Sequence, residues 1–105
     1  MEPRISIVTL GVSDLDRSRT FYRKLGWKES ASSNDGVVFF QAGCLIFGLY
    51  PRDKLAEDAQ VPDDGSGFRA FSLAYNVRSK DDVNAILDEA VAVRGTLVKA
   101  AEDVF

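Results

Sequence analysis

The same succession of local patterns occurs twice along the chain, and this duplication constrains the fold more than any other feature. Each half carries a strand pattern, a serine suited to cap a helix, an apolar helical face, a glycine suited to end the helix, and a further strand pattern. The two capping candidates, Ser13 and Ser79, lie 66 residues apart. We therefore expect an internal duplication of one α+β module.

The first half supplies the more complete copy of this pattern. Ile5–Leu10 is rich in β-branched residues and is predicted to form a strand. Ser13, with Asp16 three residues later, predicts a helix N-cap, and Gly26 predicts the helix end. Pro51–Ala59 is predicted to form a short polar helix. Three further strands are predicted, at Trp27–Ala31, Val37–Gln41 and Cys44–Tyr50.

The second half is shorter than the first. It offers a strand at Phe68–Val77, a helix that Ser79 caps and Gly95 ends, and the start of a strand at Thr96–Ala100. Two strands are lacking relative to the first half. The predicted organisation is a single domain over 1–105, with module one at 1–59, a linker at 60–67, and a truncated module two at 68–105.

A sheet without its last strands leaves backbone N–H and C=O groups unpaired along an edge. We expect a second copy of the chain to satisfy that edge, so the sequence predicts a homodimer. The edge in question is the one near Thr96–Phe105, which could be satisfied within the chain, by another copy or not at all. An end at Phe105 fits either a fragment or a naturally short second module.

Composition excludes several classes of function. The net charge is −3 and basic residues do not cluster, which argues against a nucleic-acid surface. No apolar run approaches the roughly 20 residues that span a bilayer, and the N-terminus lacks a signal-peptide pattern. The only cysteine, Cys44, cannot form an intrachain disulfide, and we expect it to be buried and inert. These features predict a cytoplasmic protein without membrane or nucleic-acid partners.

The chain contains no histidine, which removes most common catalytic arrangements. Ser-His and Cys-His nucleophile pairs, histidine general bases and histidine-containing metal sites are all excluded. Asp14, Asp16, Arg23 and Lys24 lie near the ends of the first predicted helix, where their charges complement the helix dipole. No two carboxylates have a spacing that forces them together, so the sequence predicts no catalytic residue.

Two stretches carry a resemblance to a known family: VTLGVSDLDRSRTFYRKLGW in the first half and LAYNVRSKDDVNAILDEAVAVRG in the second. They resemble the vicinal oxygen chelate superfamily, which includes glyoxalase I, bleomycin-resistance proteins, fosfomycin-resistance enzymes and extradiol dioxygenases. The resemblance implies an α+β fold of two βαβββ-type modules. Their strands would form one curved mixed sheet around a cavity, with the helices outside and the last two strands of module two missing.

The resemblance also marks where metal ligands would stand in metal-dependent members of the family. The two histidine positions fall on Ile7 and Ser72, and the first glutamate position falls at or near Phe47. The last glutamate would lie beyond the residues present. Because isoleucine and phenylalanine cannot hold a divalent cation, and serine is a poor ligand, we expect no metal and no other cofactor. This pattern is similar to the metal-free, ligand-sequestering bleomycin-resistance branch.

Alternation along the strands predicts which residues would line the cavity. The predicted face is mainly apolar, with a few polar groups that could orient a small organic molecule. The same residues could instead be core packing. The predicted ligand-binding residues are Ile7, Thr9, Phe39, Gln41, Phe47, Leu49, Ser72 and Ala74.

Three functions remain open from the sequence. The first is a metal-free protein that binds a small organic ligand in an apolar cavity. The second is an enzyme of the same superfamily, a glyoxalase-like lyase, an isomerase or a dioxygenase, with metal ligands from a missing C-terminus or a partner chain. The third is an interaction module without a small ligand. The residues present favour the first, which is a binding protein rather than an enzyme.

Overall fold

The computed structural model describes residues 1–103 and divides the chain into two compact units. The first unit spans Met1–Gly65 and the second begins at Ser66. The division falls inside the segment predicted as a linker. Val104 and Phe105, which the predicted second module includes, lie outside the described residues.

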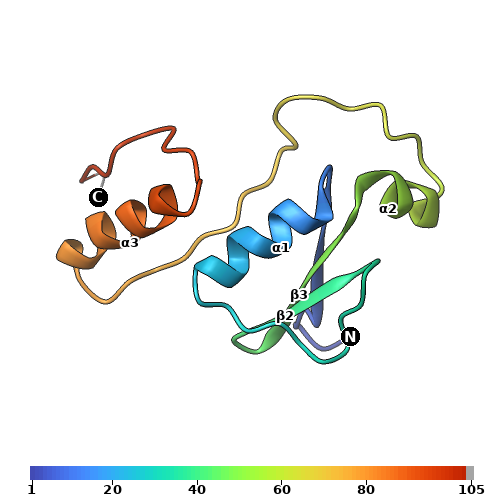
Figure 1. Ribbon diagram of the computed structural model, residues 1–105, viewed down its shortest axis with the longest axis horizontal. Coiled ribbons are helices and arrows are strands. Elements are labelled where there is room, and N and C mark those ends of the chain that lie inside the picture. The colour runs from blue at the N-terminus through green and yellow to red at the C-terminus, as the bar shows by residue number, and fades with distance from the viewer. Residues whose placement is uncertain (104–105) are drawn as a thin grey trace. The chain divides into compact units, whose positions relative to one another are not determined.

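The first unit is a small α+β structure built on an open three-stranded mixed sheet, in agreement with the predicted fold class (Figure 1). The strand order is β1-β3-β2, with β1 parallel and β2 antiparallel to β3. The parallel connection is the crossover from β1 through the first helix, as in a βαβ unit. The elements are β1 (Ile7–Val12), α1 (Leu15–Lys24), β2 (Val38–Ala42), β3 (Leu45–Pro51) and α2 (Arg52–Ala59).

The core lies between one face of this sheet and α1. Its fully or almost fully buried members are Val38 and Phe40 of β2 and Phe47 and Leu49 of β3. Register places Phe40 beside Phe47 and Val38 beside Leu49, so each pair projects from the same face. Partly buried apolar side chains close the core from the strand β1, the helix α1 and the turn after it: Leu10, Val12, Leu15, Tyr22 and Trp27.

Aromatic rings dominate the centre of this core. The ring of Tyr22 has its centroid 5.0 Å from those of both Trp27 and Phe47, and the Trp27 and Phe47 centroids are 5.4 Å apart. Tilted and edge-to-face arrangements of this kind add to the stabilisation from buried area. Trp27 therefore packs under α1, against Tyr22 and Phe47.

The ends of α1 follow the predicted chemistry with a shift of one residue at the start. Asp14, not Ser13, is the N-cap, and its Oδ1 accepts a hydrogen bond of 3.0 Å from the Arg17 backbone N–H. Aspartate is as good an N-cap residue as serine, so the helix could begin after either Ser13 or Asp14. At the other end Gly26 has a φ of 91°, and the Trp27 N–H donates to the Tyr22 carbonyl, which confirms the predicted glycine stop.

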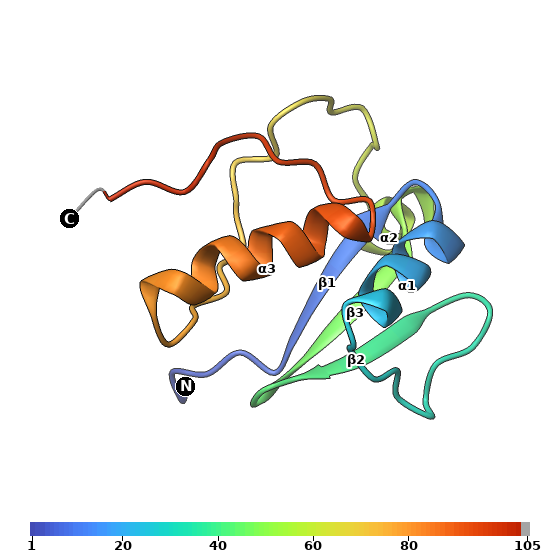
Figure 2. The same cartoon turned by 60° about the vertical axis from the view of Figure 1, so that its left-hand side comes forward.

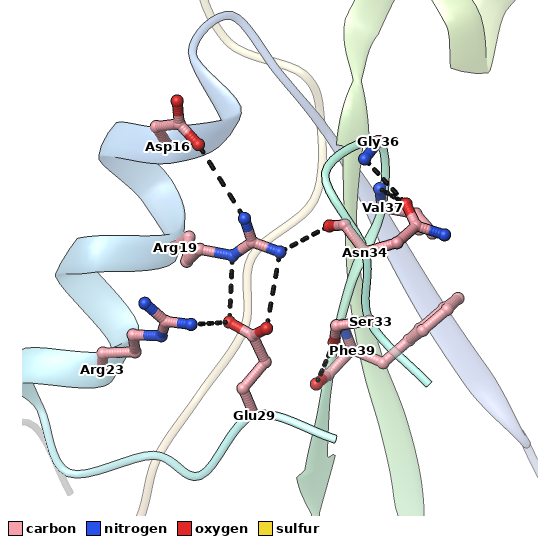
Figure 3. A network of polar contacts seen from close by, with 9 residues as sticks. All are labelled: Asp16, Arg19, Arg23, Glu29, Ser33, Asn34, Gly36, Val37 and Phe39. Carbon is pink, nitrogen blue, oxygen red and sulfur yellow. Dashed lines mark hydrogen bonds and ion pairs between the residues drawn. The ribbon is translucent and has the colours of Figure 1, made fainter. Parts of the chain in front are cut away.

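An ion-pair network fixes the segment between α1 and β2 (Figure 3). The Arg19 Nε lies 2.9 Å and the Arg23 Nη2 lies 3.0 Å from the Glu29 Oε1, and Arg19 Nη2 also donates to the Asn34 carbonyl at 2.6 Å. The predicted strand Trp27–Ala31 is reduced here to a single antiparallel bridge between Glu29 and Phe40.

The second unit contains one helix, α3 (Lys80–Ala92), and no strand within residues 66–103. Ser79 caps α3 as predicted, with its Oγ accepting from the Asp82 N–H at 3.3 Å. The strands predicted at Phe68–Val77 and Thr96–Ala100 are not formed. A strand requires backbone hydrogen bonds to a neighbour, and the described part of this unit offers these segments none.

Candidate ligand-binding face

The sheet face opposite α1 is the candidate site. Successive side chains along a strand point to opposite faces, so the residues that alternate with the core share this second face. Register joins them into rows: Ile7 beside Ile46 and Ile46 beside Gln41, then Thr9 beside Gly48 and Gly48 beside Phe39. We call this surface the open face; it consists of Ile7, Thr9, Gly11, Phe39, Gln41, Ile46, Gly48 and Tyr50.

The structure brings together four of the eight predicted site residues on the open face. Ile7 and Thr9 lie on β1, and Phe39 and Gln41 lie on β2. Ile46, which the sequence analysis did not name, lies between Ile7 and Gln41. The signal that could have found it is the parallel pairing of β1 with β3, which no local pattern reveals.

Gly48 occupies the centre of the open face. A Cβ atom at this position would lie 3.2 Å from the Thr9 Oγ1 and 3.4 Å from the nearest ring carbons of Phe39. The missing side chain thus lets the threonine hydroxyl and the phenylalanine ring approach each other over the glycine backbone. An aromatic ring beside a hydroxyl is a combination that can hold and orient an organic ligand.

The polar side chain of Gln41 is largely committed to the β2–β3 turn. Its Nε2 donates to the Gly43 carbonyl at 2.7 Å and to the Leu45 carbonyl at 3.3 Å. These two bonds hold the hairpin and leave the amide oxygen as the group still able to accept. Thr9 is consequently the more versatile hydrogen bonder on the open face, since its hydroxyl can donate and accept.

Helix α2 covers one end of the open face. A side chain at Gly11 would meet the Arg52 Cα at 3.2 Å and the Leu55 Cδ2 at 3.3 Å, so α2 fills the space that such a side chain would need. Arg52 is in turn held by Asp63, with its Nη2 2.7 Å from the Oδ1. The accessible part of the face therefore extends from Thr9 towards Ile7.

Phe47 and Leu49 do not belong to the open face, and their predicted placement with Ile7 is wrong. Phe47 pairs with Val8 and Leu49 with Leu10, so both project into the core beneath α1. The error is one residue of register, which moves a side chain to the other face of a sheet. The position beside Ile7 is Ile46, and this residue is as unable to bind a cation as Phe47.

Ser72 and Ala74 lie in the second unit and are exposed. The segment around them forms no strand, so alternation does not assign them to a common face there. Their predicted contact with a ligand remains a prediction.

Cys44 is exposed in the turn between β2 and β3, and the prediction of a buried cysteine is wrong. Gly43, with a φ of 63°, makes the tight turn that carries Cys44 out to solvent.

A polar hollow of about 280 Å³ lies between the end of β1 and the start of α1. Two of its charged residues are already engaged: Asp14 caps α1 and Arg52 pairs with Asp63. The arrangement agrees with the interpretation of the charges in α1 as helix electrostatics. Its lining consists of Gly11, Val12, Ser13, Asp14, Arg17, Ser18 and Arg52.

Comparison with known proteins decides the family. The model of the Glyoxalase/Bleomycin resistance protein/Dioxygenase superfamily matches residues 4–105. The chain belongs to this superfamily. A search of curated proteins found no match.

Solved structures support the same fold. A glyoxalase-related enzyme from Fulvimarina pelagi is 28% identical, with a TM-score of 0.75 over 88% of this chain and 66% of that protein. The hypothetical protein SA1046 from S. aureus is 19% identical, with a TM-score of 0.80 over 99% of this chain and 79% of that one. A glyoxalase/bleomycin resistance protein/dioxygenase family enzyme from Burkholderia phytofirmans PsJN is 23% identical. Its TM-score is 0.80 over 95% of this chain and 80% of that one. The chain thus spans just under two thirds of the length of the first of these relatives and about four fifths of the lengths of the other two.

The residues present do not fit the metal that part of this superfamily uses. Ile7 and Ile46 stand side by side on the open face, and neither side chain has a donor atom. Within residues 1–103, no group of three or more histidine, cysteine, aspartate or glutamate residues is placed to hold a metal ion. In the same part of the chain, none of the helices is both long and apolar enough to cross a bilayer.

Proposed function

We propose that this member of the superfamily binds a small, largely apolar organic ligand on the open face without a metal ion. The observation that carries the proposal is the Ile7–Ile46 pair beside the Thr9, Gly48 and Phe39 row. Apolar contacts there would supply affinity, while the Thr9 hydroxyl would orient one polar group of the ligand. One cysteine and no disulfide fit a reducing, cytoplasmic location for this binding.

Thermal-shift measurements with a panel of aromatic natural products test the proposal on the full chain. A ligand at about 100 times its dissociation constant stabilises the native state by about 2.7 kcal/mol, which raises the melting temperature measurably. Ile46→Glu puts a charge between Ile7 and Gln41 on the open face and should abolish the shift. Val61→Glu makes the same chemical change at an exposed linker position and should preserve it.

Elemental analysis of the purified protein provides the second arm of this test. Stoichiometric Zn²⁺, Ni²⁺, Mn²⁺ or Fe²⁺ that survives dialysis contradicts the metal-free part of the proposal. A panel in which no compound raises the melting temperature, or in which Ile46→Glu and Val61→Glu respond alike, contradicts the ligand face. The absence of any thermal shift favours an interaction module without a small ligand.

The likeness to a glyoxalase-related enzyme supports a second candidate, a metal-dependent lyase, isomerase or dioxygenase. Its metal ligands would come from beyond residues 1–103 or from a partner chain. Assays with glutathione hemithioacetal, fosfomycin and catechols, each with added metal, test this candidate. Metal-dependent turnover of any of them would replace the binding proposal with an enzymatic one.

A further inference from the structure

A row of side chains crosses the sheet at the end of the open face that α2 leaves uncovered. Strands β1, β3 and β2 lie side by side in this order (Figure 2), and register places Ile7 beside Ile46 and Ile46 beside Gln41. The first two side chains are apolar and the third is an amide. None of the residues of the open face is aspartate, glutamate, lysine or arginine. The row therefore changes from apolar to polar, without a charge, from β1 to β2.

The segment that leads into β2 folds back along the outer edge of that strand. The Ser30 N–H donates to the Phe39 carbonyl at 2.7 Å, and the Phe39 N–H donates to the Ser33 Oγ at 2.9 Å. Glu29 and Phe40 form an antiparallel bridge in the same segment. The rows of the sheet are thereby continued by one residue beyond β2.

Lys28 is the residue that continues the apolar-to-polar row. In an antiparallel pairing the residue before Glu29 lies opposite the residue after Phe40, so Lys28 lies opposite Gln41. Lys28 is exposed, and among residues 1–103 no carboxylate lies within ion-pair distance of its ammonium group. The uncharged face thus has a cation at its β2 side.

The direction of the Lys28 side chain follows from that of Glu29. The Arg19 Nε and the Arg23 Nη2 lie 2.9 Å and 3.0 Å from the Glu29 Oε1, so the glutamate side chain lies on the α1 side of the sheet (Figure 3). Neighbouring residues of an extended segment point to opposite sides. Lys28 therefore points to the side of the open face.

Lys28 is also the group at this end of the row that can donate a hydrogen bond to a ligand. The Gln41 Nε2 donates to the Gly43 and Leu45 carbonyls, at 2.7 Å and 3.3 Å, and these bonds occupy both of its N–H groups. The isoleucine side chains of the row have no donor. A negatively charged group of a ligand at this end would consequently be bound by the lysine ammonium group.

We propose that the ligand of the open face is an organic acid with an apolar body and a single carboxylate. The body lies on Ile7 and Ile46, and the carboxylate accepts a hydrogen bond from the Lys28 Nζ. Neighbouring strands are about 4.8 Å apart, so the row from Ile46 to Lys28 spans about 10 Å, which a small organic acid and the flexible lysine side chain can bridge together. This ligand class rests on the function proposed for the open face.

Matched pairs of compounds test the ligand class on the full chain. Benzoate, cinnamate and naphthoate are each compared with the corresponding uncharged primary amide by isothermal titration calorimetry. The wild-type protein should bind at least one of these carboxylates about threefold to tenfold more tightly than its amide, as expected for a charged hydrogen bond at a partly exposed site. Amides that bind as tightly as the carboxylates overturn the ligand class.

Lysine substitutions test the position of the carboxylate. Lys28→Met should lower the affinity for the carboxylate to that for the amide, and Lys28→Arg, which keeps the charge, should retain the preference. Lys24→Met makes the same change in net charge at an exposed position on α1, on the other side of the sheet, and should bind as the wild type does. Equal effects of Lys28→Met and Lys24→Met overturn the assignment of Lys28.

The failure of this inference can be told apart from the failure of the proposed function. If other compounds raise the melting temperature and Ile46→Glu abolishes that shift, but none of the carboxylates is preferred, the ligand class is overturned and the function of the open face stands. If Lys28→Met removes a carboxylate preference that Ile46→Glu leaves intact, the anion contact is supported and the apolar face is contradicted.

Discussion

Tyr22 illustrates how one buried ring links packing to pH dependence. Its ring lies among Trp27, Phe40 and Phe47, and burial raises the pKa of Tyr22 above its ordinary value of 10.0. The folded state therefore binds this proton more tightly than the unfolded chain does. That contribution to stability is complete below pH about 10 and is lost as pH rises through the raised pKa.

We predict that Tyr22→Phe changes the free energy of unfolding little at pH 7 and makes it less dependent on pH above about 10. Denaturant unfolding of both proteins between neutral and alkaline pH, followed by Trp27 fluorescence, measures this difference. Tyr75→Phe, at a residue 70% exposed, is the matched control and should keep the wild-type slope. A Tyr22→Phe curve parallel to that of the wild type at all pH values would contradict the prediction.

Phe47 and Ile46 show why the residues of the site could be predicted only in part. The stretch CLIFGLY is almost continuously apolar, so it contains no alternation that tells one face from the other. In the first strand, by contrast, alternation alone predicted Ile7 and Thr9 on one face, and the structure places Leu10 on the other face, against the core. The parallel register with β3 settled the remaining assignment, and register is a tertiary property.

At the scale of elements, the Arg19–Glu29 pair joins α1 to the segment that leads into β2. The two side chains are only 13% and 17% exposed, so water screens them weakly. Removal of the Glu29 charge leaves the mostly buried Arg19 with only the Asn34 carbonyl and the more distant Asp16 carboxylate as partners. The pair therefore positions the segment that closes the β2 edge, through Ser30 and Ser33.

We predict that Glu29→Gln lowers the free energy of unfolding by about 1–3 kcal/mol, as expected when a charged hydrogen-bond partner is lost. Glu57→Gln, at an exposed position on α2, should change it by less than about 0.5 kcal/mol. In the double variant Arg19→Met/Glu29→Gln the loss should be smaller than the sum of the single losses. Additive losses, measured by urea unfolding, would show that the pair carries no coupling.

Helix ends were easier to predict than strands for a physical reason. A cap depends on residues within one turn, so Ser79 and Gly26 could be recognised locally. A strand depends on a neighbour that is distant in the sequence, and Phe68–Val77 has the composition of a strand without a partner in the described structure. The fold class could be predicted from local sequence patterns, whereas the pairing of strands depends on residues that are distant in the sequence.

At the scale of the whole molecule, the two units differ in how much apolar surface they bury. All four core residues lie in the first unit, and no residue of the described part of the second unit is fully buried. In the second unit Phe68 is 84% exposed, although its side chain is large and apolar. Cooperative stability comes from such burial, so it should be concentrated in the first unit.

We predict that limited proteolysis of the full chain cuts first between Gln60 and Val77, where almost every residue is exposed and none is helical or extended in a sheet. Mass spectrometry should identify a resistant fragment that contains Met1–Ala59, and its Trp27 fluorescence should remain that of the intact protein. The physical reason is that a protease needs several residues of unfolded backbone, which the sheet and α1 supply only on global unfolding. First cuts between β1 and β3 would contradict the concentration of stability in the first unit. Equal resistance throughout residues 1–103 would show that the second unit shares the cooperative core.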